Sequence, residues 1–464
     1  MDPADAYVKL YDLLRTVDAS VLSDWSDTEQ AREIADQVRL EVERDGSLSA
    51  RVLPDPLIES PGVFAVLLGL DLALLHASKE MDTLAFNPLD GLRTRLTMTG
   101  RLNDETSGFL VFKRSVSLRP NEDPEHLDDF LNLIRVSPYD SADLHMQYVP
   151  ELYDLPDMEA ISDAEELGSP PPLTVAQLPF LAEPDDVRWR TFDTRAGFYY
   201  STMPDSERLL PHLTDALTAL DDSGAVLGIL PESCLDDTLF GKWCELLEST
   251  PRPESSSLTW IVLGSGPVSR AGPSLQSNRP PNRAVLVHRS GRARLLLTQD
   301  KQSGFTFTVD KQHEYRVDLG DVKRDEYIPH VHQLTLLESR LGRFGIQICE
   351  DLGRPERHQR LTAAGVTHLV VPVLAAAMWN QGWQARAGET LGVRSGMKVV
   401  VSNGLAIHRF FNEMPAPTLL VVSGPQGTQD HYLKSEELVR VSSNVNGKTM
   451  EAREDALKPR TAQW

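Results

Sequence analysis

The chain has 464 residues and a formal net charge of −22 at pH 7, with 41% hydrophobic and 25% charged residues. This length predicts two or three domains, and the composition is that of a folded globular protein, which excludes a disordered or disulfide-stapled chain. The charge is uneven, because residues 1–180 hold 34 acidic and 14 basic residues while residues 181–464 hold 34 and 32. Neither part has the basic excess that binding to nucleic acid or an anionic membrane needs, so we expect neither partner.

Cysteine content and the N-terminus indicate a reducing compartment. The chain has only three cysteines, Cys234, Cys244 and Cys349. Such an odd, sparse set predicts neither a disulfide framework nor a paired zinc site. The opening sequence MDPADAYVKL lacks the basic and apolar regions of a signal peptide, and the longest apolar run, Gly62–Leu75, is too short to span a bilayer and contains Asp71. We therefore expect a cytoplasmic protein in which this run is a buried helix.

The N-terminal 145 residues predict a mixed α/β domain. Apolar residues recur every four positions from Thr28 to Arg44, which indicates an amphipathic helix. Extended segments at Thr94–Met98 and Phe109–Val116 predict a hairpin, and Pro124–Ile134 predicts another helix. No catalytic motif lies in this domain. Its acid excess predicts a solvated surface, or a face that binds a basic protein partner.

Residues 146–184 are the expected linker. No Lys or Arg occurs from Val136 to Val187, and the acidic run ends in three prolines, Pro170–Pro172. Acid-rich and proline-rich sequence resists packing and favours extended backbone. A plain connector is the simpler interpretation, although a ligand for a partner's groove stays open.

Residues 185–464 predict an α/β domain of alternating strands and helices. The expected strands are Val187–Phe192, Ala225–Leu230, Phe344–Ile348, Val366–Val371 and Lys398–Ser402, and the expected helices cover Leu209–Leu220, Pro355–Ala364 and Trp379–Ser395. In such a domain the reactive groups lie where strands end at their carboxyl edge.

Three apolar strands are followed directly by a reactive side chain. Glu232 follows the strand in GILPESC, Lys301 follows LLLTQD, and Cys349 ends the strand in FGIQIC. A thiol, a carboxylate and an ammonium together provide a nucleophile, its acid–base partner and a cation for a developing oxyanion. Each of these residues alone is more simply interpreted as a core or surface side chain. The hypothesis of a catalytic site therefore depends on the three occurring together.

The order and flanks of these segments resemble the nitrilase, or carbon–nitrogen hydrolase, superfamily over approximately residues 185–440. The matching segments are VLGILPES with Glu232, WIVLGSGP, PPNRAVLVHRSGRARLLLTQDK with Asn282, Gly291 and Lys301, FGIQICEDLGRPERHQRLTAAGVTHLVVP with Cys349, Asp351, Pro355, Glu356 and Gly365, and WQARAGETLGVRSGMKVVVSNG with Trp383, Arg386 and Asn403. The resemblance implies a four-layer α-β-β-α sandwich, pairing of sheets across a homodimer or higher oligomer, and no metal or organic cofactor.

The resemblance also implies a reaction. Cys349 would attack the carbon of a small amide or, less commonly, a nitrile, with Glu232 as acid and base. Lys301 and the backbone N–H of Glu350 would hold the oxyanion, and Asp351 and Asn403 would support the site.

A second glutamate between the lysine and the cysteine is expected from the family, and three are present. The candidates are Glu314, Glu326 and Glu338. Spacing does not select one, and we favour Glu314. Lys311 is the alternative to Lys301, which we prefer because it directly follows the apolar strand.

Other polar residues receive simpler interpretations. Cys234 could line the pocket, and Cys244 is expected to pack on a helix. His330 and His332 have no third ligand at suitable spacing for a metal site. A different class of function also stays open, because nitrilase-like domains occur fused to other modules, including in bacterial defence proteins: an assembly or sensing module whose N-terminal domain binds a partner.

Overall fold

The computed structural model forms two compact units. It describes residues 1–49, 60–79, 109–112, 127–136, 144–148, 174–270, 279–289, 295–329, 333–339, 342–364, 366–375, 383–395, 397–407, 418–424, 427–432 and 460–463. The first unit comprises Met1–Leu152, Leu336–Arg343 and Gln359–Thr367, and the second comprises Tyr153–Thr335, Phe344–His358 and His368–Trp464.

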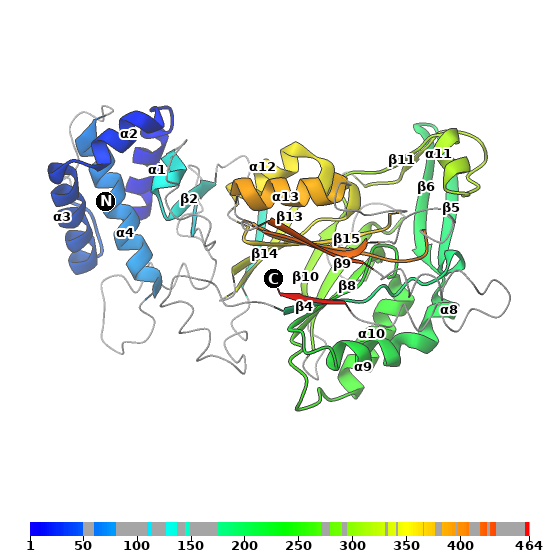
Figure 1. Cartoon of the computed structure of the whole chain (residues 1–464). Helices are drawn as coiled ribbons and strands as arrows, with labels where there is room; N and C mark the ends of the chain where they lie inside the picture. The colour runs from blue at the N-terminus through cyan, green and yellow to red at the C-terminus, as the bar shows by residue number, and fades with distance from the viewer. Residues whose placement is uncertain are drawn as a thin grey trace. The chain divides into compact units, whose positions relative to one another are not determined.

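The first unit is built on a cluster of helices (Figure 1). Its elements are α1 (Pro3–Leu14), α2 (Ala19–Ser26), α3 (Glu29–Asp45), α4 (Pro61–Lys79), β1 (Phe109–Phe112), η2 (Leu127–Phe130), β2 (Leu133–Val136) and β3 (Leu144–Tyr148). The expected helix at 28–44 is confirmed as α3, because Thr28 caps it by accepting the N–H of Ala31 at 3.2 Å and Gly46 ends it with a φ of 66°. The apolar run around Asp71 is confirmed as the buried helix α4.

One expected element of this unit is wrong, and another lies partly outside the described residues. Strand β1 pairs antiparallel with β2, whereas the hairpin partner expected at 94–98 lies outside the described residues. The helix expected over Pro124–Ile134 is a single 3-10 turn, η2, followed by β2. The buried Asp71 carboxylate explains the change, because it accepts the N–H groups of Asn132 at 2.9 Å and Leu133 at 3.0 Å, which an α-helix would have used itself.

The second unit is a sandwich of two sheets between helices. The first sheet has the order β10-β9-β8-β7-β4-β19, with β4 (Thr174–Gln177), β7 (Leu227–Ile229), β8 (Trp260–Pro267), β9 (Asn282–His288), β10 (Leu295–Asp300) and β19 (Arg460–Gln463). The second sheet contains, in the order β18-β17-β16-β15-β14, the strands β14 (Gly342–Ile346), β15 (His368–Val373), β16 (Lys398–Asn403), β17 (Thr418–Gly424) and β18 (Gly427–Tyr432). The rings of Trp260 and Phe344 meet edge-on at 4.9 Å, so the two sheets face each other.

Helices cover the outer faces of this sandwich (Figure 1). Helix α13 (Trp383–Ser395) packs on β16 and β17, while α9 (Leu213–Asp221) and α10 (Asp237–Ser249) cover the first sheet through one buried apolar cluster. The shorter elements α8 (Ser206–Leu209) and η5 (Leu210–His212) lead into α9, and α12 (Pro355–Ala363) precedes β15. The α/β class and the four-layer order are therefore confirmed.

The linker and the start of this domain need a correction. Strand β4 lies inside the expected linker 146–184, yet it pairs with β7 in the first sheet. The sequence TVAQLPFLA is apolar from Val175 onward, and Val175, Leu178 and Phe180 are fully buried. The predicted linker ended too late, because a lack of basic residues is common to linkers and buried strands and does not distinguish them. The sandwich thus begins at about residue 174, and residues 149–173 lie outside the described part.

A smaller sheet stands beside the sandwich. Its order is β11-β12-β6-β5, with β5 (Val187–Thr194), β6 (Gly197–Pro204), β11 (Thr306–Phe307) and β12 (Arg324–Glu326), accompanied by η4 (Pro184–Asp186) and α11 (Val309–Glu314). The strand expected at Val187–Phe192 is therefore real, but it belongs to this sheet. Among the helices that the structure describes, none combines the length and apolarity needed to cross a bilayer.

Candidate active site

Glu232 lies where the two sheets of the sandwich meet at their strand ends. It follows β7 after Pro231 and is 3% exposed. Its backbone N–H donates to the carbonyl of Val373 at 3.3 Å, and its Oε2 accepts the N–H of Leu374 at 3.0 Å. Because Val373 ends β15 of the second sheet, these bonds fix the carboxylate against both sheets.

Cys349 lies on a sharp turn after β14. It opens η6 (Cys349–Gly353) with a φ of 48°, in the left-handed region that residues other than glycine seldom adopt. The turn is held by the Asp351 carboxylate, which accepts the N–H of Ile348 at 3.2 Å and that of Gln302 at 3.1 Å. Gln302 directly follows Lys301, so one carboxylate joins the cysteine turn to the lysine segment.

Lys301 is buried between two carboxylates. Its Nζ donates to Glu232 Oε1 at 2.8 Å and to Glu326 Oε2 at 2.6 Å. Asn282 joins the same two carboxylates, donating from Nδ2 at 2.9 Å and 3.2 Å. The backbone N–H of Lys301 donates to the carbonyl of Asn282 at 2.8 Å, which ties the ends of β9 and β10 together. The ammonium is therefore held in one place by charged hydrogen bonds.

Among the candidate glutamates whose side chains the structure describes, Glu326 and not the favoured Glu314 hydrogen-bonds Lys301. Glu326 ends β12 and is 8% exposed, whereas Glu314 is exposed at the end of α11. Glu338 lies in β13 (Leu334–Ser339). The choice of lysine agrees with the geometry, because Lys301 touches both carboxylates while the Lys311 Nζ lies over the Phe305 ring, 4.4 Å from its centroid.

The charges of the site act strongly on one another. Burial raises the pKa of Glu232, while Lys301 and a hydrogen bond from the Cys349 thiol act in the opposite direction. Burial and the negative charge of Glu232 raise the pKa of Cys349 well above its usual range, and Lys301 opposes them. Burial alone would lower the pKa of Lys301, but Glu232 and Glu326 raise it well above normal. The resting site thus holds an ammonium and a protonated thiol beside Glu232.

Asn403 and Asp351 support this group, and Glu350 points elsewhere. The Asn403 side chain accepts the N–H of Ala375 and donates to its carbonyl, both at 3.0 Å. It thereby fixes the backbone next to Leu374, whose N–H donates to Glu232. Burial raises the pKa of Asp351 to about 6. The Glu350 carboxylate pairs with Arg354 at 3.0 Å. The group of Glu350 expected to stabilise an oxyanion is its backbone N–H, which directly follows Cys349.

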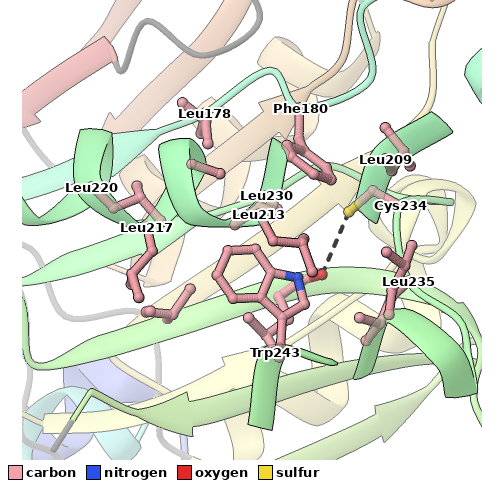
Figure 2. Packing of buried hydrophobic residues seen from close by; sticks show 14 of the residues in the cluster. Leu178, Phe180, Leu209, Leu213, Leu217, Leu220, Leu230, Cys234, Leu235 and Trp243 are labelled. Carbon is pink, nitrogen blue, oxygen red and sulfur yellow. Dashed lines mark hydrogen bonds between the residues drawn. The ribbon is translucent and has the colours of Figure 1, made fainter. Parts of the chain in front are cut away.

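The other cysteines and the histidines take no part in this group. Cys234 is fully buried in the apolar cluster under α9 and α10, where its thiol donates to the carbonyl of Pro231 at 2.9 Å (Figure 2). Burial raises the pKa of this thiol, and its place inside the apolar cluster does not agree with the expectation that it lines the pocket. Cys244 lies on α10 and is partly exposed. His330 and His332 lie outside the described residues, and within the described part no three His, Cys, Asp or Glu side chains are grouped to hold a metal.

Known proteins resemble part of this chain. No protein-family model matches it. A 141-residue stretch is 31% identical to deaminated glutathione amidase from Yersinia enterocolitica, and the match covers 28% of this chain and 43% of that protein. The chain thus spans less than half the length of the curated relative it matches. That relative is an amidase, and the match confirms the resemblance to carbon–nitrogen hydrolases over the aligned stretch.

Solved structures of similar proteins include two from the same broad group. An amidase from Nesterenkonia, with the acetamide moiety of fluoroacetamide on its active-site cysteine, is 15% identical, and the match covers 58% of this chain and 93% of that one with a TM-score of 0.37. Nit3 from Saccharomyces cerevisiae, a member of branch 10 of the nitrilase superfamily, is 14% identical over 60% of this chain and 96% of its own, also with a TM-score of 0.37.

Proposed function

Because this chain carries a domain of the nitrilase, or carbon–nitrogen hydrolase, superfamily, we propose that it hydrolyses a non-peptide carbon–nitrogen bond with Cys349 as nucleophile. The observation that supports this most is the position of Lys301, which hydrogen-bonds Glu232 and Glu326 while all three act electrostatically on the Cys349 thiol. A buried ammonium held beside a thiol is placed to stabilise negative charge that develops there.

In the first half of the reaction, Cys349 Sγ attacks the amide carbon and Glu232 takes the thiol proton. The carbonyl oxygen becomes an oxyanion that the Lys301 ammonium and the N–H of Glu350 stabilise. When the carbon–nitrogen bond breaks, Glu232 returns the proton to the departing amine. The enzyme is then a thioester at Cys349.

In the second half, water attacks the thioester carbon and Glu232 takes a proton from that water. The same oxyanion donors act again, the carbon–sulfur bond breaks, and the thiolate of Cys349 receives the proton from Glu232. The products are a carboxylic acid and an amine or ammonia. The raised pKa of Glu232 suits both roles, because a carboxyl group with a pKa nearer to neutrality exchanges protons more readily in both directions.

We take an amide as the substrate in preference to a nitrile. Cleavage of an amide needs an acid that protonates the departing amine, and Glu232 has this role in the proposed mechanism. The relative with 31% identity is also named an amidase. The resemblance to the family implies no metal or organic cofactor, and the mechanism uses only side chains of this chain.

The test incubates the chain with a panel of small amides and nitriles and measures the ammonia that is released. The wild-type chain should release ammonia from at least one amide, and Cys349→Ala should abolish the release while Cys244→Ala, a change at the partly exposed thiol of α10, should not. Wild-type activity that survives in Cys349→Ala would refute the proposal. A chain that hydrolyses nothing while it self-assembles or retains a partner would favour the assembly or sensing module.

Self-association, a basic protein partner for the acidic N-terminal unit and a cytoplasmic location stay predictions. Light scattering of the full chain tests the first, and the expected result is a mass at least twice that of one 51.6 kDa chain. A monomer at micromolar concentration would contradict it.

A further inference from the structure

The small sheet beside the sandwich carries one carboxylate of the site and contacts the residue next to the other. Glu326 ends β12, and β12 pairs in parallel with β6, so that Glu326 lies opposite Tyr200. The backbone of this strand is held on both sides, because Glu326 N–H donates to the carbonyl of Phe305 and Tyr327 N–H donates to that of Tyr200, both at 2.9 Å. The hairpin of β5 and β6 thus supports the strand that carries the second glutamate (Figure 1).

Tyr200 reaches Glu326 through the backbone of one residue, Phe305. Its hydroxyl donates to the carbonyl of Phe305 at 3.2 Å, and the N–H of Phe305 donates to Glu326 Oε2 at 3.1 Å, the same oxygen that accepts from Lys301. Tyr200 is 2% exposed, and burial together with the charge of Glu326 raises the pKa of its phenol well above normal. The phenol therefore stays protonated and remains a donor.

Thr202 contacts the residue that follows Glu232. The hydroxyls of Thr202 and Ser233 lie 2.6 Å apart, and Ser233 directly follows Glu232. Ser233 is fully buried and has a φ of 64°, a conformation that costs free energy for a residue other than glycine and has to be held by its surroundings. The bond from β6 is one such restraint.

Tyr200 and Thr202 lie two positions apart, so they share one face of β6. We propose, on the premise of the hydrolase function above, that this face of β6 positions both carboxylates of the site, with Tyr200 acting on Glu326 and Thr202 acting on Glu232. Both are positioning residues. A displacement of well under 1 Å at either carboxylate would misplace the proton acceptor or the oxyanion cation, and such small shifts are costly in catalysis.

The variants that test this remove one hydroxyl each and keep the shape. Tyr200→Phe and Thr202→Val should each lower kcat about 3- to 10-fold, the effect expected for one lost hydrogen bond, with KM changed less than about twofold. The matched controls are Tyr199→Phe and Ser201→Ala on the opposite face of β6, where Tyr199 packs on Phe192 and Tyr327. The controls should keep kcat within about twofold of the wild type.

A second readout separates positioning from a loss of fold and does not need a substrate. The rate at which iodoacetamide alkylates Cys349 is measured against pH by mass spectrometry. In Tyr200→Phe and Thr202→Val its acid limb should move to higher pH, because the segments that hold the two carboxylates are less firmly fixed and the ionised carboxylates are then hydrogen-bonded less well, while the melting temperatures stay close to those of the controls. Alkylation profiles and kcat values equal to those of Tyr199→Phe and Ser201→Ala would overturn the proposal. If the wild-type chain hydrolyses no amide while Tyr200→Phe and Thr202→Val still show the shifted alkylation, the hydrolase function alone is refuted.

Discussion

Replacing Glu326 by glutamine tests how the site holds its ammonium. In the structure Glu326 accepts hydrogen bonds from Lys301 at 2.6 Å, from Phe305 N–H at 3.1 Å and from Asn282 at 3.2 Å. A glutamine has one acceptor oxygen and an NH₂ group that only donates, so at least one of these donors loses its partner. A hydrogen bond to a charged group contributes about 1.5–3 kcal/mol, and each 1.4 kcal/mol is a factor of ten in rate. We expect kcat/KM of Glu326→Gln to fall roughly 10- to 100-fold.

The fold should tolerate this change, because Lys301 keeps its ion pair with Glu232. The assay compares ammonia release and melting temperature for Glu326→Gln and for Glu314→Gln, the exposed glutamate at the end of α11 that the sequence favoured. The control should keep kcat/KM within about twofold of the wild type. Equal losses in the two variants, or full activity in Glu326→Gln, would refute this assignment of the second carboxylate.

The pKa of Glu232 is raised by burial, and a base must be ionised to act, so kcat/KM should rise with pH through a limb above the usual glutamate pKa of about 4.3; a limb near pH 4 would contradict this. Asp71→Ala removes the acceptor of the backbone N–H groups of Asn132 and Leu133, at about 1–3 kcal/mol for the buried one of Leu133, so hydrogen exchange of α4 and β2 should quicken while that of β15 and β16 stays unchanged. Asp300→Asn removes the carboxylate that pairs with the buried Arg283, so the melting temperature should fall; an unchanged value would contradict a structural role for the pair. Gly264→Ala places a methyl group against the carbonyl oxygen of the residue before Glu232 at a φ of 72°, so both stability and kcat should fall.

The residues that end core strands could be predicted from the sequence. Glu232, Lys301 and Cys349 each follow a strand whose core-facing residues are apolar, and in an α/β sandwich such positions meet at one edge of the sheets. The strands before these three residues belong to the buried core of the sandwich. The pattern of hydrophobic residues that marks such strands is the strongest structural signal in a sequence. Helices α3 and α4 were predictable for the same reason.

Glu326 could not be selected, because its position depends on a distant pairing. Strand β12 has only three residues, Arg324–Glu326, and no apolar alternation marks it. It is fixed by β6, which lies more than 120 residues earlier in the chain, with Asp325 opposite Tyr199. Sequence reasoning also missed Tyr200 and Thr202 for this reason. A signal was present in the aromatic residues of β5 and β6, which indicated a packed strand pair, but nothing local linked it to the site.

Strand β4 and the turn before β2 were missed for different physical reasons. Strand β4 has four residues next to an acidic, proline-rich run, and its burial comes from pairing with β7 and β19. The segment before β2 has the composition of a helix, but the carboxylate of Asp71, from a helix some 60 residues away, takes its backbone donors. Both outcomes depend on long-range partners that local propensity does not contain.

The most direct test of the account is to locate the reactive thiol. The full chain is treated with a haloacetamide at neutral pH, digested and mapped by mass spectrometry. The account predicts that Cys349, activated by Glu232 and Lys301, carries the adduct first, that Glu232→Gln slows its formation, and that the fully buried Cys234 stays unmodified. Adducts on Cys234 or Cys244 with Cys349 unmodified would contradict it.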